Sequence, residues 1–121
     1  MDDRNRLKLL AKELKKNTDI MEMTFAKYNL QVLQYAYHPY GEDDADCELI
    51  IEVMSADGNA MAEDAGIKIN LYDDAGEIFF TAGQFVDADE FAGYDTFKIC
   101  LYNNSSTLLE AKSARIYMSK S

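Results

Sequence analysis

Acidic side chains gather in three polar stretches of this chain, and they are the residues best suited to bind a metal ion. Calcium takes several oxygen ligands from a flexible loop or from loops that meet. The stretches contain Glu42, Asp43, Asp44 and Asp46; Asp57, Asn59, Glu63 and Asp64; and Asp87, Asp89, Glu90 and Asp95. None has EF-hand spacing, because alanine stands where that loop requires glycine, at Ala62 or Ala92.

Two of these stretches can meet in space. If successive strands run up and down, the loops at 55–66 and 86–95 share one end of the fold. Calcium is therefore the one cofactor that the sequence suggests, and the competing interpretation is a pair of solvated acidic loops. The candidate ligands are Asp57, Asp64, Asp87 and Asp89.

Catalytic motifs are absent from the sequence. The sole histidine, His38, precedes Pro39, and no pattern supplies it with a nucleophile and an orienting partner. There is no glycine-rich phosphate loop, no His–Glu metal motif and no cysteine pair at ligand spacing. We expect His38 to be a partly exposed strand-end residue, and we predict no catalytic residues and no enzymatic activity.

The charge of the chain is strongly and unevenly negative. Its 121 residues, typical of one domain, include 22 acidic and 12 basic side chains, a net charge of −10. A field of this sign repels phosphate backbones, so nucleic acid is not an expected partner. Residues 1–16 carry 6 basic and 3 acidic side chains, or +3, against −13 for the remainder. Such a basic arm can dock on its own acidic domain or on a neighbour's.

The sequence contains no apolar run of about 18 residues and therefore predicts no membrane span. Charged residues interrupt the apolar stretch near the N-terminus, which argues against a signal peptide. A cytoplasmic protein is expected if Met1 is the native start. Cys47 and Cys100 both lie in apolar strand contexts, where we expect buried thiols, and a bridge between facing strands is the alternative.

Periodicity predicts the elements that position these residues. Leu7, Leu10, Ala11 and Leu14 form one helical stripe, so 4–16 is predicted as an amphipathic helix and 1–18 as a helical arm on a domain at 19–121. Alternation of apolar and polar residues predicts an all-β, immunoglobulin-like antiparallel β-sandwich of about seven strands. The expected strands lie near 21–28, 31–38, 47–55, 67–73, 77–85, 96–102 and 112–119. Expected inward residues include Leu33, Tyr35, Tyr37, Leu49, Ile51, Val53, Ile67, Ile69, Leu71, Ile78, Phe80, Phe97, Ile99, Leu101, Ala114, Ile116 and Met118.

Several tyrosines have positions that suggest a role. Tyr94, beside Gly93 and just before a strand, is predicted to be a tyrosine corner that ties down the backbone. Tyr72, Tyr102 and Tyr117 share outward parity on their strands, and an exposed tyrosine patch is typical of interfaces. The alternative is that the helix covers this patch or that it is ordinary sheet surface. The candidate interaction residues are Leu7, Leu10, Leu14, Tyr72, Tyr102 and Tyr117.

A short motif, Ile69-Asn70-Leu71-Tyr72-Asp73 followed by Asp74-Ala75-Gly76, resembles that of the FxLYD domain, a small bacterial and archaeal β-sandwich. Ile69 stands where the family has phenylalanine, and the resemblance extends over roughly 65–119. It implies a sandwich with no established chemistry. Members are usually attached to the cell envelope, whereas this chain shows no export signal.

Together these features predict a non-catalytic protein-interaction or assembly module, binding a protein partner or a second copy of itself. The alternative function is a calcium-dependent binding module that uses loops 55–66 and 86–95. A carbohydrate-binding sandwich ranks last, because the chain has no tryptophan to serve as a stacking platform.

Overall fold

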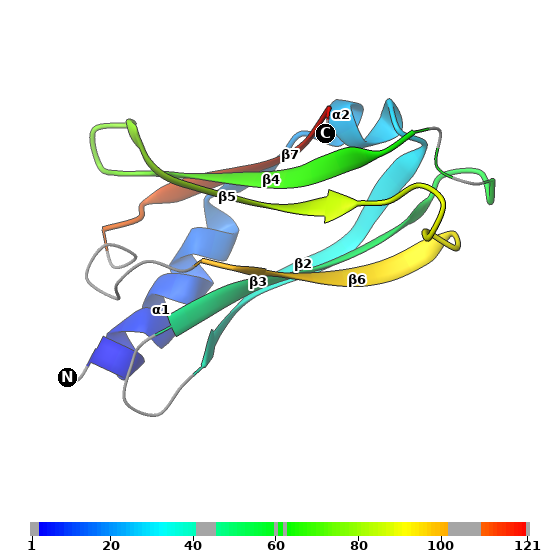
Figure 1. The fold of residues 1–121 in the computed structure, drawn as a ribbon. Coiled ribbons are helices and arrows are strands. Elements are labelled where there is room, and N and C mark those ends of the chain that lie inside the picture. Colours follow the sequence, from blue (N-terminus) through cyan, green and yellow to red (C-terminus); the bar gives the residue numbers. More distant parts are fainter. Residues whose placement is uncertain (1–2, 41–45, 60, 62, 102–109, 121) are drawn as a thin grey trace.

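The computed structural model describes residues 3–40, 46–59, 61, 63–101 and 110–120 (Figure 1). Side chains are described from residue 8 onward, except those of Tyr40 and Asp46. The elements are α1 (Asp3–Lys16), β1 (Thr18–Ile20), α2 (Glu22–Ala26), β2 (Leu30–Tyr40), β3 (Asp46–Ser55), β4 (Ala65–Tyr72), β5 (Ile78–Val86), β6 (Tyr94–Cys100) and β7 (Ser113–Lys120).

The described strands form two facing sheets, so the predicted all-β sandwich is confirmed (Figure 1). One sheet has the order β1-β7-β4-β5 and the other β2-β3-β6. Neighbouring strands are antiparallel except β1 and β7, which run parallel. The division into four and three strands is that of a constant-type immunoglobulin domain, whereas the order differs, because here the first strand pairs with the seventh.

The core lies between the sheets and follows the predicted alternation. Apolar residues at every second position of β3, β4 and β7 are buried, because successive side chains of a strand point to opposite faces. The predicted inward residues Leu49, Ile51, Val53, Ile67, Ile69, Leu71, Ile116, Ala114, Met118, Ile99, Leu101 and Tyr37 are all buried.

Two predicted inward residues are exposed, and a β-bulge accounts for each. In β2 the pairing passes from Val32–Val53 to Gln34–Glu52, so Leu33 is an extra residue that points away from the core. In β5 a second shift leaves Phe79 unpaired, and Ile78 is exposed. A bulge adds one residue to one strand and reverses the side-chain parity beyond it.

The predicted strand at 21–28 is wrong: this segment holds the short helix α2, and the strand precedes it at Thr18–Ile20. Phe25 on α2 is buried in the core. Backbone contacts to β7 hold the segment, because Met21 N donates to Ile116 O (2.9 Å) and Met118 N donates to Thr24 Oγ1 (2.9 Å). Tertiary packing therefore overrides the local alternation that suggested a strand.

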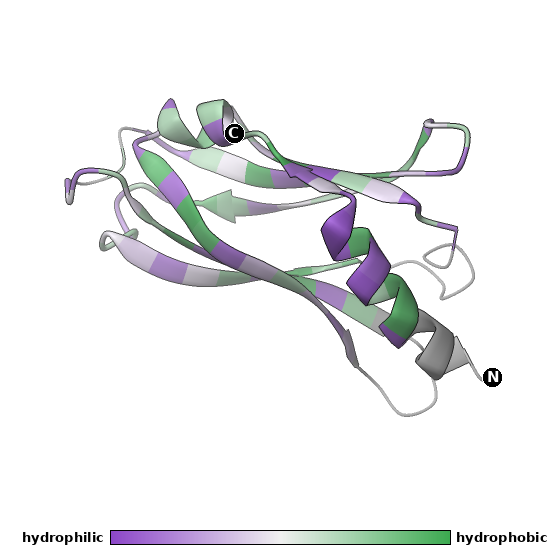
Figure 2. Ribbon diagram, turned by 180° about the vertical axis from the view of Figure 1, so that it is seen from behind, coloured by the Kyte–Doolittle hydropathy of each residue, from purple (hydrophilic) through white to green (hydrophobic). Residues whose placement is uncertain are grey.

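Helix α1 packs on its own domain and crosses from one sheet to the other (Figure 2). Ala11 and Leu14 are buried beside Tyr37 of β2 and Leu71 of β4. Tyr35 Oη donates to the Lys15 carbonyl (3.1 Å), which fixes the last turn of α1 on β2. The predicted amphipathic helix is confirmed, and it closes the sandwich along the side where β1 and β2 lie.

The two cysteines occupy opposite faces of the β2-β3-β6 sheet. Cys100 pairs with Glu48, so its side chain shares the outer parity of Glu48, whereas Cys47 faces inward. The expectation of two buried thiols holds for Cys47 and is wrong for Cys100, which is exposed, and no disulfide joins them. Burial raises the pKa of the Cys47 thiol to about 12.

This arrangement predicts selective alkylation. Because the thiolate is the reactive form, iodoacetamide should modify Cys100 in the folded protein at neutral pH and should reach Cys47 only after unfolding in denaturant. Mass spectrometry of the intact protein checks this, with Cys100→Ser as the control that should remain unmodified while folded. Equal modification of both thiols in the folded protein would contradict the burial of Cys47.

Candidate functional site

Strand β5 is the edge of the four-stranded sheet and has an unusual sequence for an exposed edge. Its nine residues, Ile-Phe-Phe-Thr-Ala-Gly-Gln-Phe-Val, include no charged side chain and no proline. Among the described strands, β4 alone pairs with it. Ile78 and Phe85 expose more than half of their surface. A long, uncharged edge is a template on which a further strand can pair.

The alternation of antiparallel hydrogen bonds identifies the backbone groups at the free side of β5. Asp73 N donates to Glu77 O, whereas Tyr72 O accepts from Lys112 N on the opposite side of β4. The backbone N–H and C=O groups of the odd-numbered residues of β4 therefore point toward β5. Their partners on β5 are even-numbered, Phe80 and Ala82 among them. The backbone N–H and C=O groups of Thr81, Gly83 and Phe85 are left on the side away from β4.

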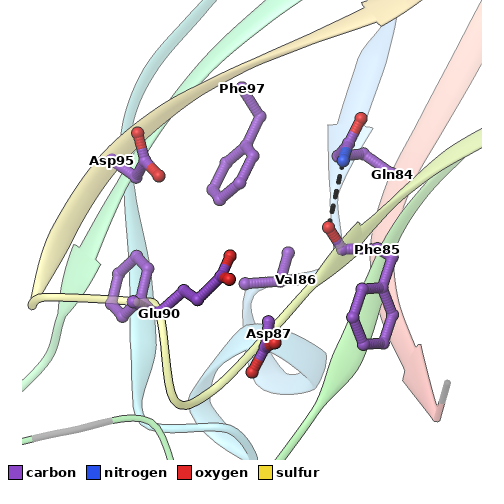
Figure 3. A pocket seen from close by; sticks show the side chains of 8 residues that line it. Gln84, Phe85, Val86, Asp87, Glu90, Asp95 and Phe97 are labelled. Carbon is purple, nitrogen blue, oxygen red and sulfur yellow. Dashed lines mark hydrogen bonds between the residues drawn. The ribbon is translucent and has the colours of Figure 1, made fainter.

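A groove of about 290 Å³ opens beside the end of β5, between β5 and β6 (Figure 3). Val86 and Phe91 are buried at its base, and the ring of Phe97 projects into it from β6. Phe97 pairs with the buried Ile51, so it belongs to the inner face of its sheet. The groove is thus the gap between the two sheets, reached from the side opposite α1.

The polar lining of the groove is acidic. Asp87, Glu90 and Asp95 contribute carboxylates, and no lysine, arginine or histidine is among the residues described as lining it. Asp87 Oδ1 accepts from Asp89 N (2.9 Å) and Asp95 Oδ1 accepts from Thr96 N (2.8 Å), so both side chains are held by local backbone. Each carboxylate keeps its second oxygen as a further acceptor.

Gln84 explains why the sandwich opens here. It pairs with the buried Ile67, so it occupies an inward position of β5, where an apolar residue would close the core. Its amide nitrogen instead donates to Phe85 O (3.1 Å) and remains exposed (Figure 3). Burying a polar side chain without a partner is costly, so a glutamine at this inward position favours a groove that stays open to water.

The predicted calcium ligands are partly brought together. Ala88 N donates to Asp64 Oδ1 (2.8 Å), so the loops after β3 and β5 meet. Asp57 accepts from Asn59 N and from the Asn29 amide, contacts that lower the pKa of this carboxyl. Asp89 is exposed. Within the described residues, no three acidic, histidine or cysteine side chains are grouped as a metal site requires. Glu42, Asp43 and Asp44 lie outside the described residues, and calcium binding stays a prediction.

Two of the predicted interaction residues of α1, Leu10 and Leu14, pack against the protein's own core. Leu14 is buried and Leu10 half-buried, and the side chain of Leu7 lies outside those described. Leu10 and Leu14 therefore contribute to the packing of this domain.

The predicted outward tyrosines are half-buried on the outer face of the β1-β7-β4-β5 sheet. Arg115 lies over the Tyr72 ring at 5.7 Å, and Tyr117 Oη donates to the Asn70 amide oxygen (3.3 Å). Tyr102 lies outside the described residues. These contacts tie Tyr72 and Tyr117 to neighbouring strands, which makes them part of the sheet surface.

Tyr94 is not a tyrosine corner. Its hydroxyl donates to the side chain of Glu52 on β3, which also accepts from Gln34, and these two hydrogen bonds lower the pKa of Glu52. The tyrosine side chain therefore ties neighbouring strands together on the outer face of the sheet, where a corner would bond to nearby backbone.

His38 and the Tyr72-Asp73 motif have structural roles. His38 is exposed at the end of β2, as predicted, and its Nδ1 lies 3.2 Å from Glu48 Oε1. Asp73 Oδ1 accepts from Ala75 N (2.9 Å) and Glu77 N (3.0 Å), which orders the turn between β4 and β5. The motif therefore fixes where β5 begins.

No protein-family model, curated protein or solved structure matches this chain. The described part of the chain also holds no helix with the length and apolarity that a membrane crossing demands. The resemblance to the FxLYD domain stays a prediction. The β5 edge and its groove are not among the sites predicted from the sequence, although an uncharged run between Glu77 and Asp87 marks the edge.

Proposed function

We propose that this protein is a non-catalytic protein-interaction module that captures an extended segment of a partner as an added strand on β5. Strand addition supplies main-chain hydrogen bonds for affinity and side-chain pockets for specificity. One observation carries the proposal: β5 has no charged residue of its own and directs backbone groups of Thr81, Gly83 and Phe85 away from β4. Of these groups, Phe85 O accepts from the Gln84 amide, which an added strand would have to displace.

The other edge strands that the structure describes are protected, which makes β5 the exception among them. Strand β1 has three residues, β2 contains Pro39 and is covered by α1, and β6 carries Asp95 and Lys98. Short length, proline, charge and a covering element are the devices by which proteins prevent unwanted edge pairing. Strand β5 has one such device, the bulge at Phe79, near its beginning, and the stretch from Thr81 to Phe85 has neither a proline nor a charged residue of its own.

Proline at Thr81 should block strand addition and leave the fold intact. The Thr81 N–H faces away from β4, so Thr81→Pro removes a donor that only an added strand would use. We expect it to weaken binding of a fluorescein-labelled peptide of alternating lysine and valine by roughly tenfold or more, read by fluorescence anisotropy. Thr81→Val keeps the N–H and should bind as the unmodified protein does.

Hydrogen exchange locates the contact independently. Binding of the same peptide should slow exchange of the amides of Thr81, Gly83 and Phe85. Thermal melts of both variants verify that each is folded. Strand addition is wrong if folded Thr81→Pro binds as tightly as Thr81→Val, or if the peptide protects other amides and leaves β5 unchanged.

A further inference from the structure

We propose that the segment captured by β5 is basic and carries an apolar anchor, and that the groove between β5 and β6 selects it. This inference rests on the proposed strand addition and names the chemistry of the partner. Specificity in strand addition comes from pockets for alternate side chains of the added strand. The groove lies beside the end of β5 and is lined from Gln84 to Asp87, so it lies along the path of such a strand.

The apolar base of the groove is the reason to expect an apolar anchor residue in the partner segment. Val86 and Phe91 are buried there, and Phe97 presents its half-buried ring from the opposite sheet. An added strand directs every second side chain toward the inner face of the β1-β7-β4-β5 sheet, the face to which Gln84 and Val86 belong. An apolar side chain of the partner at such a position removes the exposed aromatic surface of Phe97 from water.

The acidic rim of the groove is the reason to expect basic residues in the partner segment. Asp87, Glu90 and Asp95 supply three carboxylates, and no described lining residue carries a positive charge. Lys68, on the neighbouring strand, lies across Gly83 on the outer face of the sheet, away from the groove. Figure 3 shows the Glu90 carboxylate directed toward Val86, and Asp95 across the groove from Gln84. Complementary charge at a rim selects partners and accelerates association more than it adds affinity.

A second copy of this chain fits the edge less well than a basic partner. Antiparallel pairing of two β5 strands centred on Ala82 would place Glu77 of each copy opposite Asp87 of the other. Each copy also carries a net charge of −10. Like charges directly opposite one another destabilise a strand pair, so the flanking residues disfavour self-pairing.

The experiment compares two labelled peptides of equal length, one repeating Val-Thr-Lys-Thr and one repeating Val-Thr-Glu-Thr, so that valine and the charged residue fall on the same face of an added strand. Both are offered to the full chain and to the variant Asp87→Asn, Glu90→Gln, Asp95→Asn, whose isosteric amides keep the local acceptors. A control variant, Glu22→Gln, Asp74→Asn, Glu110→Gln, changes the net charge equally at exposed sites that do not line the groove. Anisotropy gives the affinities, and light scattering gives the oligomeric state.

We expect the lysine peptide to bind, the glutamate peptide to bind at least tenfold more weakly, and the groove variant to lose roughly tenfold toward the lysine peptide. The control variant should change binding less than twofold. Equal binding of the two peptides, or equal losses in the two variants, overturns the basic-partner inference and leaves strand addition standing.

Two other outcomes decide between a basic partner and a second copy, or reject strand addition itself. A dimer that Thr81→Pro dissociates assigns the edge to a second copy and overturns the basic partner. If neither peptide binds at millimolar concentration, the proposed function and this inference both fail.

Discussion

Replacing Leu14 with aspartate is expected to lower the free energy of unfolding by about 4 kcal/mol or more, enough to unfold much of the population of a marginally stable domain. Leu14 is 4% exposed and packs where α1 meets both sheets, beside Tyr37 and Leu71. The change removes a buried leucine and places a carboxylate among buried apolar side chains. Urea denaturation followed by circular dichroism measures the effect.

Leu9→Asp provides the matched control on the same helix. Leu9 is 52% exposed, so the same substitution there should change stability by less than about 0.5 kcal/mol. Both variants add one negative charge to the same basic helix, so the difference in stability between them does not come from the change in net charge. If Leu14→Asp were as stable as Leu9→Asp, α1 would not be packed on its own domain, and the role of this helix would have to be sought in another molecule.

The sequence predicts much of the core because strands β3, β4 and β7 alternate without interruption. Leu49, Ile51 and Val53 are spaced two residues apart and therefore point to the same, inward face of their strand. The same holds for Ile67 and Ile69. The stripe of α1 is predictable on similar grounds, since one apolar face of a helix must be covered. In these elements local pattern and tertiary packing agree.

Prediction fails where a long-range contact decides the local conformation. The alternation of 21–28 resembles a strand, but Phe25 enters the core from a helical turn that β7 holds at Ile116 and Met118. Bulges at Leu33 and Phe79 also escape a pattern analysis, because one additional residue reverses the side-chain parity of the rest of the strand.

The candidate site is hidden from the sequence for a related reason. The apolar residues near Ile78 and Phe80 suggest a buried strand, and only the sheet order reveals that β5 is an edge. The groove joins Val86 to Phe97, which belong to different sheets, so no local motif describes it. The acidic loops were visible in the sequence, whereas their position beside an open edge was not.

The two sides of the sandwich differ in a way that favours binding. Helix α1 closes the side of β1 and β2 with Ala11 and Leu14, while the groove lined by Gln84 opens on the opposite side, between β5 and β6. The helix covers the edge strand β2, whereas no described helix covers β5 in the same way. The unprotected β5 is therefore consistent with an edge reserved for a partner strand.

Phe25→Ala is expected to lower the free energy of unfolding by about 3–5 kcal/mol, comparable with the effect at Leu14. Phe25 is 1% exposed and is the buried residue of α2, the five-residue helix that joins β1 to β2. Because so short a helix is not stable alone, its position depends on the burial of this ring together with the hydrogen bonds to β7. Chemical denaturation with two spectroscopic probes tests whether the loss is global.

Met23→Ala is the matched control, two residues earlier on the same helix. Met23 is 85% exposed, so truncation there should cost less than about 0.5 kcal/mol, while alanine slightly favours the helix in both variants. A strand at 21–28 would place residues 23 and 25 on the same face, since side chains of a strand alternate with a period of two, and would predict similar losses. A large loss at Phe25 with none at Met23 therefore distinguishes the helix from the strand, and equal losses would reverse that assignment.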